Sequence, residues 1–246
     1  MQHRKPEARR RAPALAVLAL ALTACGDCPD SFELTERALV RPDQRIVLTA
    51  PDGELEVVGR ERAAMLEVEA RGCRARGGAR IVLDTLAGAR SVRVVAPHAD
   101  VRAYVPAGAE VEVRHGSGGV EVRAVGPTMV ETRGGAVRVQ QVIGSVVITA
   151  GPGTLYVREV VGDVEIEDGP GAIFVEGVMG SVRLRDGSGG IHAREIEGDV
   201  IVEADGSGSI DARTVAGDFV VRAKSDDRRM ISHGDVGGRV QLPDAY

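Results

Sequence analysis

The sequence predicts an all-β protein, a single-chain parallel β-helix (β-solenoid) with rungs of about 18 residues. Glycines recur at a constant spacing over much of the second half, at Gly126, Gly144, Gly162, Gly180 and Gly198, and apolar residues alternate with polar ones between them. Aromatic residues make up only 2% of the 246 residues, so a core must be built from Val, Ile, Leu and Ala. The net charge of −5 comes with scattered basic residues, so we predict no nucleic-acid partner.

Residues 1–24 have the features of a lipoprotein signal peptide. Five basic residues precede an apolar stretch from Ala12 to Ala24, which ends in Leu22-Thr-Ala-Cys25. Small residues directly before a cysteine resemble the bacterial lipobox, in which that cysteine becomes the lipidated first residue of the mature protein. This resemblance implies lipidation at Cys25, an extracytoplasmic location, membrane attachment through the lipid and an anchor linker over 25–43. An ordinary signal peptide with an incidental cysteine is the alternative.

Two further cysteines, Cys28 and Cys73, follow the predicted lipidation site. In an oxidising compartment we expect a disulfide between them, which would tie the mature N-terminus to the first β region. Two free thiols are the alternative, since sequence cannot show that the two Cα atoms approach each other. No histidine lies near either cysteine in the sequence, so a zinc site there is not expected.

Residues 44–115 alternate apolar and polar residues but lack the regular glycine spacing. Short strands are expected from about residues 45, 54, 65, 91 and 101, with a turn at Pro51-Asp-Gly53. We interpret this N-terminal β region as a cap that protects one end of the solenoid.

Residues 116–243 contain the repeat itself. Each repeat unit divides into two halves that read Gly, any residue, apolar, any residue, apolar, followed by a turn. Apolar residues two positions apart predict short strands with one buried face, and a fixed period predicts rungs that stack by parallel pairing. Five inward columns are expected. One is formed by Val146, Val164, Val182, Val200 and Phe219, and a second by Ile148, Ile166, Leu184, Val202 and Val221.

Several segments together resemble the putative-adhesin family of bacterial β-strand-repeat proteins. They are Val105-Pro-Ala-Gly108, His115-Gly-Ser-Gly118, the repeated Gly-Asp-Val and Gly-Ser-Gly, and the closing Gly238-Arg-Val-Gln-Leu-Pro243. The resemblance covers roughly residues 44–243. It implies a parallel β-helix outside the cytoplasm and an adhesion role, and the family supplies no catalytic motif.

The few aromatic residues are expected to gather on one outward face. Tyr156, Phe174 and His192 fall one rung apart, and arginines flank them. Rings can stack against sugars or apolar groups, and arginines donate to carboxylates. The predicted binding face therefore consists of Arg138, Tyr156, Arg158, Phe174, His192, Arg194 and Arg213. The alternative is a surface ladder that only stabilises the stack. Another outward column predicts register-fixing ion pairs along Glu131, Thr149, Glu167, Arg185, Glu203 and Arg222.

We find no catalytic, metal or cofactor motif in the sequence, and we predict none. Calcium-binding nine-residue repeats carry an aspartate where this chain has Ile173, Ile191 and Ile210. We therefore expect no enzyme but an adhesion or envelope-interaction module, whose partner would be an envelope glycan or a surface protein. The alternatives are a ligand-free scaffold or envelope-stress accessory protein, and a polysaccharide-active β-helix enzyme.

Overall fold

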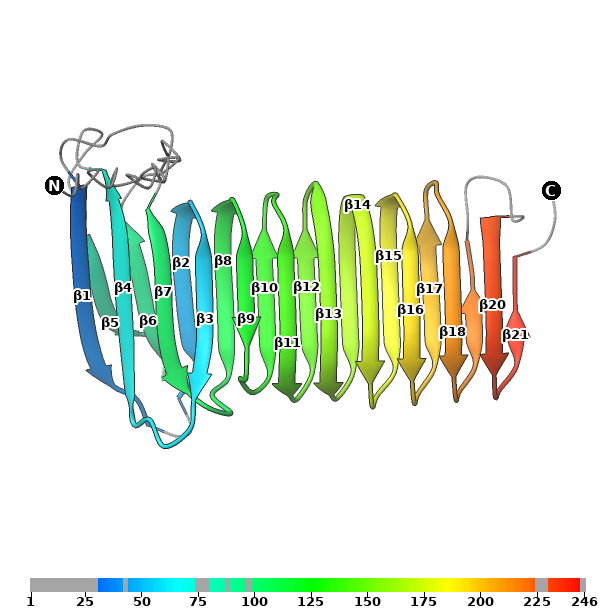
Figure 1. The fold of residues 1–246 in the computed structure, drawn as a ribbon, viewed down its shortest axis with the longest axis horizontal. Helices are drawn as coiled ribbons and strands as arrows, with labels where there is room; N and C mark the ends of the chain where they lie inside the picture. The colour runs from blue at the N-terminus through cyan, green and yellow to red at the C-terminus, as the bar shows by residue number, and fades with distance from the viewer. Residues whose placement is uncertain are drawn as a thin grey trace, which may run out of the picture.

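The structure is a computed structural model that describes residues 31–41, 44–73, 80–86, 89–95, 99–223 and 230–243. Its regular elements are strands, which line up side by side along a rod (Figure 1). Within these ranges there is no helix with the length and hydropathy needed to cross a membrane. The predicted signal peptide, Cys25 and Cys28 lie outside the described residues.

The first third of the described chain supplies β1 (Ser31–Leu39), β2 (Ile46–Asp52), β3 (Leu55–Arg60), β4 (Met65–Cys73), β5 (Arg80–Leu86), β6 (Ala89–Val95) and β7 (Asp100–Pro106). The remainder supplies β8 (Val111–Ser117), β9 (Val120–Arg123), β10 (Thr128–Thr132), β11 (Val137–Ile143), β12 (Val146–Ala150), β13 (Gly153–Val161), β14 (Val164–Val178), β15 (Val182–Ser188), β16 (Ile191–Ile196), β17 (Val200–Asp205), β18 (Ile210–Val215), β19 (Phe219–Val221), β20 (Ile231–Val236) and β21 (Val240–Gln241).

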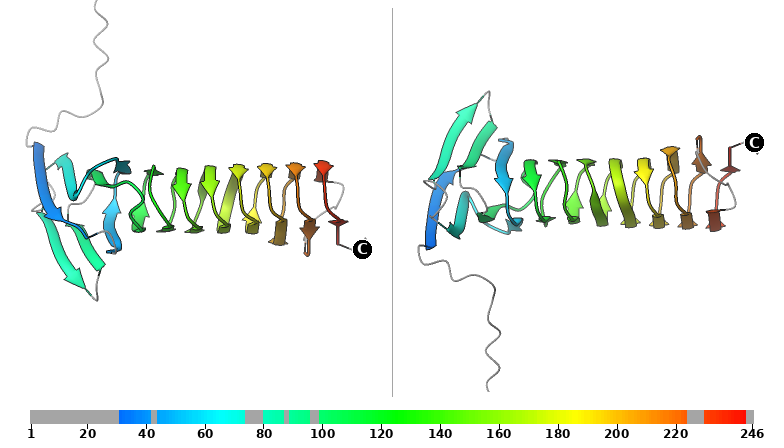
Figure 2. Two further views of the ribbon diagram at one scale, coloured as in Figure 1. Left: turned by 90° about the horizontal axis from the view of Figure 1, so that it is seen from below. Right: turned by 90° about the horizontal axis from the view of Figure 1, so that it is seen from above.

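From β8 onward, each rung gives one strand to each of two facing sheets (Figure 2). Sheet A contains β9, β11, β13, the second half of β14, β16, β18 and β20. Sheet B contains β8, β10, β12, the first half of β14, β15, β17, β19 and β21. Neighbouring strands are parallel, and Val146 pairs with Val164, which pairs with Val182. This arrangement confirms the predicted fold class.

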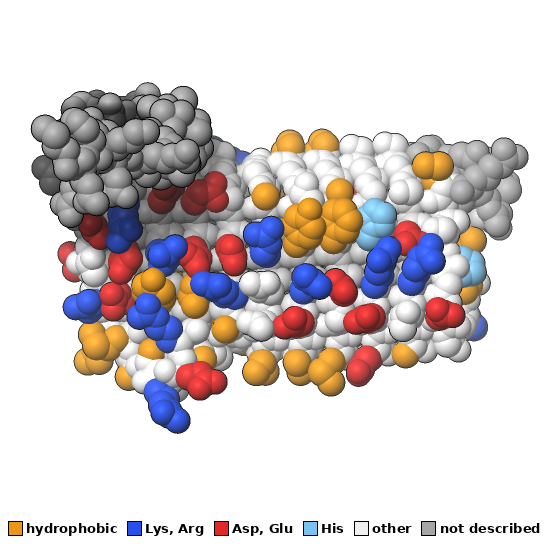
Figure 3. Space-filling model, viewed as in Figure 1, with side chains coloured by type: hydrophobic (Ala, Val, Ile, Leu, Met, Phe, Trp, Pro, Cys, Tyr) orange, Lys and Arg blue, Asp and Glu red, His pale blue; other side chains and the backbone are white. Residues whose placement is uncertain are grey.

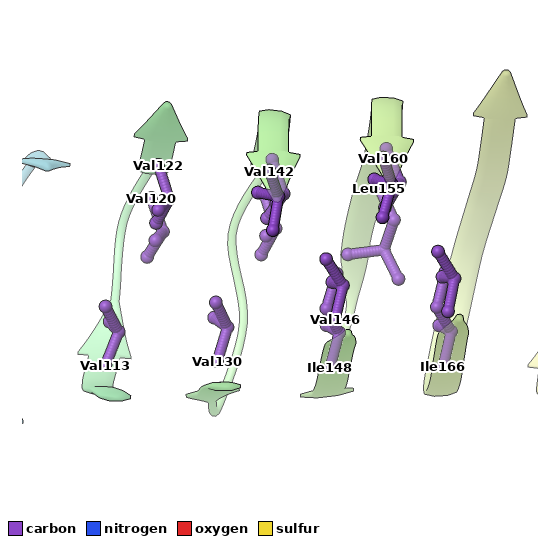
Figure 4. Packing of buried hydrophobic residues seen from close by; sticks show 14 of the residues in the cluster. Val113, Val120, Val122, Val130, Val142, Val146, Ile148, Leu155, Val160 and Ile166 are labelled. Carbon is purple, nitrogen blue, oxygen red and sulfur yellow. The ribbon is translucent and has the colours of Figure 1, made fainter. Parts of the chain in front are cut away.

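The core is a set of columns of aliphatic side chains between the two sheets. Every member of the predicted column from Val146 to Phe219 is at most 1% exposed, as is every member of the column from Ile148 to Val221. Figure 4 shows the labelled Val146, Ile148 and Ile166 directed toward side chains of the opposite sheet, such as Leu155 and Val160. Each rung therefore buries its apolar residues against the rungs on either side and against the facing sheet.

The N-terminal region joins the rod by a different order of strands. The rung made by β2 and β3 lies between β6–β7 on one side and β8–β9 on the other, and all these pairings are parallel. Parallel stacking therefore begins before residue 116, the predicted start of the repeat region. Beyond this stack, β4 pairs antiparallel with β7 and β1 pairs antiparallel with β4, while β5 and β6 form an antiparallel pair.

The N-terminal segment holds a strand that the sequence did not predict, and a cysteine that forms a disulfide bond. Residues 31–39, which the sequence placed in an anchor linker, form β1, because Phe32 packs into the core with only 5% of its surface exposed. Cys73, the last residue of β4, is disulfide-bonded. Since Cys28 lies outside the described residues, its pairing with Cys73 stays a prediction.

Candidate functional site

The predicted binding face lies on the outer surface of sheet A. Strand register places Arg138 of β11 beside Tyr156 of β13, which is followed in turn by Phe174 of β14, His192 of β16 and Asp211 of β18. Figure 3 shows this face of the rod, with a short row of hydrophobic side chains, a histidine beside it and basic side chains around it. The sequence prediction that these residues form one outward column is thus correct in register.

The aromatic side chains form a stacked ladder. The ring centroids of Tyr156 and Phe174 are 5.0 Å apart, those of Phe174 and His192 are 4.8 Å apart, and each pair is within 9° of parallel. The guanidinium carbon of Arg138 lies 5.5 Å from the Tyr156 centroid. Because both faces of Phe174 and both faces of Tyr156 are covered in this way, the ladder presents ring edges outward. The expected flat ring surface for a sugar is therefore not available at these two residues.

The neighbouring outward column carries the arginines. Arg158 of β13 pairs with Glu176 of β14 at 2.9 Å. Arg194 of β16 and Arg213 of β18 lie side by side in register and are each 56% exposed. Like charges directly opposite each other in a sheet repel, so this pair needs compensation.

Asp211 supplies that compensation. Its carboxylate lies 3.6 Å from Arg194 and 3.0 Å from Arg213, and it also accepts a hydrogen bond of 2.7 Å from the Ser232 hydroxyl. The hydrogen bond from Arg213 is the main reason that the pKa of Asp211 is lowered. One half-buried carboxylate thus holds two exposed guanidinium groups together. The face from β11 to β18 combines four arginines with Glu176 and Asp211, and Arg138 also pairs with Glu121 of β9 at 3.8 Å.

Sheet B carries a similar but separate arrangement. Glu203 pairs with Arg222 at 2.9 Å and with Arg183 at 3.4 Å. The predicted ion-pair column through these residues is wrong at one position, because a β-bulge after Leu184 places Arg185 beside Ala204 instead of Glu203. No row of aromatic rings accompanies these arginines among the described residues of sheet B.

A column of buried aspartates was missed by the sequence analysis. Asp168, Asp186 and Asp205 point into the solenoid and are 6%, 6% and 2% exposed. Asp168 follows the inward Ile166 by two positions, and Asp186 follows Leu184 by two, so both continue the inward alternation. That alternation was the available signal, but each aspartate precedes a glycine and was taken as part of a turn.

Metal ligands and an open groove are the two other kinds of site that the described residues could offer. The described residues contain no group of three or more His, Cys, Asp or Glu side chains that could hold a metal ion. An open groove of about 690 Å³ runs along one corner of the rod, past Val178, Met179, Glu195, Thr214 and Val236. Neither the aromatic ladder nor the arginine pair lines it.

Comparisons with known proteins give two structural likenesses. No protein-family model matches the chain, and no curated protein matches it in sequence. The fold is similar to that of a putative cell adhesion protein from Clostridium sporogenes, which is 11% identical, with 87% of this chain and 100% of that chain covered and a TM-score of 0.33. It is also similar to a putative adhesin from Bacteroides fragilis, which is 12% identical, with 88% and 100% covered and a TM-score of 0.36. At these identities the likeness concerns the fold alone.

Proposed function

We propose that this protein is a lipid-anchored, extracytoplasmic β-solenoid that binds an acidic glycan of the cell envelope and so acts as an adhesion or interaction module. The observation that carries the proposal is the exposed pair of Arg194 and Arg213, which Asp211 holds side by side next to a row of aromatic edges. The core does not need this arrangement, since both guanidinium groups lie outside it. The proposed module has no catalytic role.

Anionic sugars suit this surface better than neutral ones. Arg213 directs its Nε–H toward Asp211 at 3.0 Å, so the outer N–H groups of its guanidinium can face a ligand. A guanidinium group binds a carboxylate through two parallel hydrogen bonds, which gives both affinity and orientation. Arg138 and Arg158, further along the same face, are paired with Glu121 and Glu176, so the acidic sugar would be held mainly at β16 and β18. The ring edges of Phe174 and His192 would contact the apolar CH groups of the same sugar chain.

We expect the double variant Arg194→Gln with Arg213→Gln to bind an immobilised acidic polysaccharide at least about tenfold more weakly than the wild type, because two charge-assisted contacts are lost. Binding should be measured on the detergent-solubilised full chain, with a neutral polysaccharide of similar length as the reference ligand. The melting temperature should change little, since both side chains are exposed.

The matched control is Arg183→Gln with Arg222→Gln, which removes two arginines that share one carboxylate on sheet B. This control should keep its affinity. The variant Tyr156→Ala with Phe174→Ala should lose less affinity than the sheet A arginine variant, because the rings offer only edges. Equal losses in both arginine variants would mean nonspecific charge attraction. If the wild type binds no acidic polysaccharide but captures a surface protein through the same arginines, the glycan proposal fails and the interaction proposal stands.

A ligand-free scaffold is the second candidate function. The close stacking of Tyr156, Phe174 and His192 favours it, since a ladder in which rings cover each other's faces stabilises neighbouring strands without any partner. Retention of all cell-surface attachment by the folded sheet A arginine variant would favour the scaffold.

The anchor is tested separately. We expect Cys25→Ser to prevent lipidation and to move the protein from the membrane fraction to the soluble fraction, because lipid chains would supply the membrane affinity. Fractionation followed by immunoblotting measures this, and Cys73→Ser serves as a control that keeps the predicted lipidation site. A Cys25→Ser protein that stays in the membrane fraction would contradict the lipoprotein assignment. The disulfide-bonded Cys73 supports an oxidising compartment.

A further inference from the structure

Three aspartates occupy one interior column of the solenoid. Strand register pairs Asp168 with Asp186 and Asp186 with Asp205, so neighbouring residues of the column lie one strand spacing, roughly 4.8 Å, apart. All three are more than nine-tenths buried. We infer that Asp168 and Asp186 form a pair of stacked carboxylic acids inside the solenoid, which holds the rungs of β14 and β15 together in acid and loosens them as the pH rises.

The backbone keeps this column aligned despite an irregular repeat. Val182 pairs with Val200, which follows it by one regular period of the repeat. Asp186 pairs with Asp205, which follows it by one residue more than the regular period. The bulge after Leu184 absorbs the extra residue. Without the bulge, Ala204 would occupy the position beside Asp186. The local irregularity therefore has the effect of placing a third carboxyl in the column.

The first two carboxyls have no compensating side-chain donors. The side-chain oxygens of Asp168 and Asp186 are buried and accept no hydrogen bond of ordinary geometry. The backbone N–H groups of Gly169, Gly187 and Ser188 lie nearby and act only to lower the two pKa values. Ala150 of β12 adjoins Asp168 in the column. Across the interior, sheet A presents aliphatic side chains, namely Leu155, Ile173, Ile191 and Ile210. Burying an ionised carboxylate in such surroundings is costly, so the neutral acid is favoured.

The charged groups that act on the column are the carboxyls themselves. Burial raises the pKa of Asp168 from its ordinary value of 3.8 to about 6. Burial, followed by repulsion from Asp205 and Asp168, raises the pKa of Asp186 to about 7, although the nearby backbone N–H groups of Gly187 and Ser188 oppose the shift. Among the described residues no basic side chain opposes these two shifts.

The raised pKa values of Asp168 and Asp186 determine whether the stability of the fold rises or falls with pH. A folded-state pKa above the unfolded value means that the folded protein binds protons more tightly, so stability falls as the pH rises. The loss begins near pH 3.8 and is complete once the pH exceeds the folded values of about 6 and about 7. His115, three strands away in the same column, acts in the opposite direction, because burial lowers its pKa and acid would charge it. The test must therefore compare variants with the wild type at each pH.

We expect the double variant Asp168→Asn with Asp186→Asn to melt roughly 10 °C above the wild type at about pH 8 and to lose that advantage at about pH 4. Circular dichroism of the full chain in detergent measures the melting temperatures. Infrared spectra at about pH 6 should show the C=O stretch of protonated carboxyls in the wild type and its reduction in the variant. If the asparagines prevent folding, Asp168→Ala with Asp186→Ala serves instead, since Ala150 already occupies this column.

Glu167→Gln is the matched control, because Glu167 precedes Asp168 on the same strand but is exposed. Its melting temperature should follow that of the wild type at every pH. A difference between the double variant and the wild type that does not change with pH would overturn the inference, as would an infrared band of equal size in the two proteins.

Discussion

Val182→Asp is expected to destabilise the solenoid by about 3–5 kcal/mol, because it places a carboxylate without a partner in the core. Val182 is 0% exposed, and its two neighbours in the column are Val164 and Val200. Neither neighbour can donate a hydrogen bond from its side chain. Chemical denaturation followed by circular dichroism should show a much lower midpoint, or no cooperative transition.

Arg183→Asp introduces the same side chain one position later, where it points outward. Arg183 is 52% exposed and pairs with Glu203 at 3.4 Å, so its replacement should cost about 1 kcal/mol or less. Equal losses for the two variants would contradict the assignment of inward and outward positions on β15.

The inward columns could be predicted from the sequence because three signals agree there. Apolar residues alternate, glycines mark the turns, and both recur with one constant period. Agreement among local signals of this kind is what specifies one structure. The alignment of Tyr156, Phe174 and His192 one rung apart followed from the same periodicity, and the register confirms that alignment. The sequence did not reveal that the rings would cover each other's faces, since this depends on side-chain torsions that alternation does not constrain.

The order of the N-terminal rungs could not be predicted for a different reason. β2 and β3 are inserted between β6–β7 and β8–β9, which follow them in the chain. Pairing between strands that are distant in sequence leaves no local pattern, and this region lacks the glycine period. The sequence supported strands in this region, and it offered no basis for choosing their neighbours.

The aspartate column shows the limit of assigning one role to each residue type. Asp-Gly is typical of turns, and Asp186-Gly187 does end a strand. The same aspartate also occupies the last inward position of that strand, where burial controls its chemistry. The lengthened separation between Asp186 and Asp205 was visible in the sequence, but only the paired strands show that a bulge realigns them.

The second large loss of stability is expected for a glycine in a turn that follows the aspartate column. Gly189 has a φ of +142°, and a Cβ added there would lie 1.4 Å from the carbonyl oxygen of Gly171 in the preceding rung. That oxygen belongs to the backbone of the preceding rung and cannot move away without separating the two rungs. On the other side, Gly189 is held to the following rung by a 2.7 Å hydrogen bond from its N–H to the Ser207 carbonyl. Gly189→Ala is therefore expected to destabilise the protein by about 3–5 kcal/mol in chemical denaturation.

Gly177 shows that positive φ alone does not require glycine in this solenoid, and it provides the control. Its φ is +68°, and the nearest atom to an added Cβ is the Glu159 nitrogen at 3.6 Å, an ordinary contact. The same corner of other rungs holds Gln141 and Glu195 at φ values of 57° and 55°. Gly177→Gln should change the stability by about 1 kcal/mol or less, because the strain of positive φ is partly offset by the lower entropy of the unfolded chain. If both glycine variants lost stability equally, backbone conformation would be the cause and contact between rungs would not. A large loss only in Gly189→Ala would show that close approach of successive turns is what fixes glycine there.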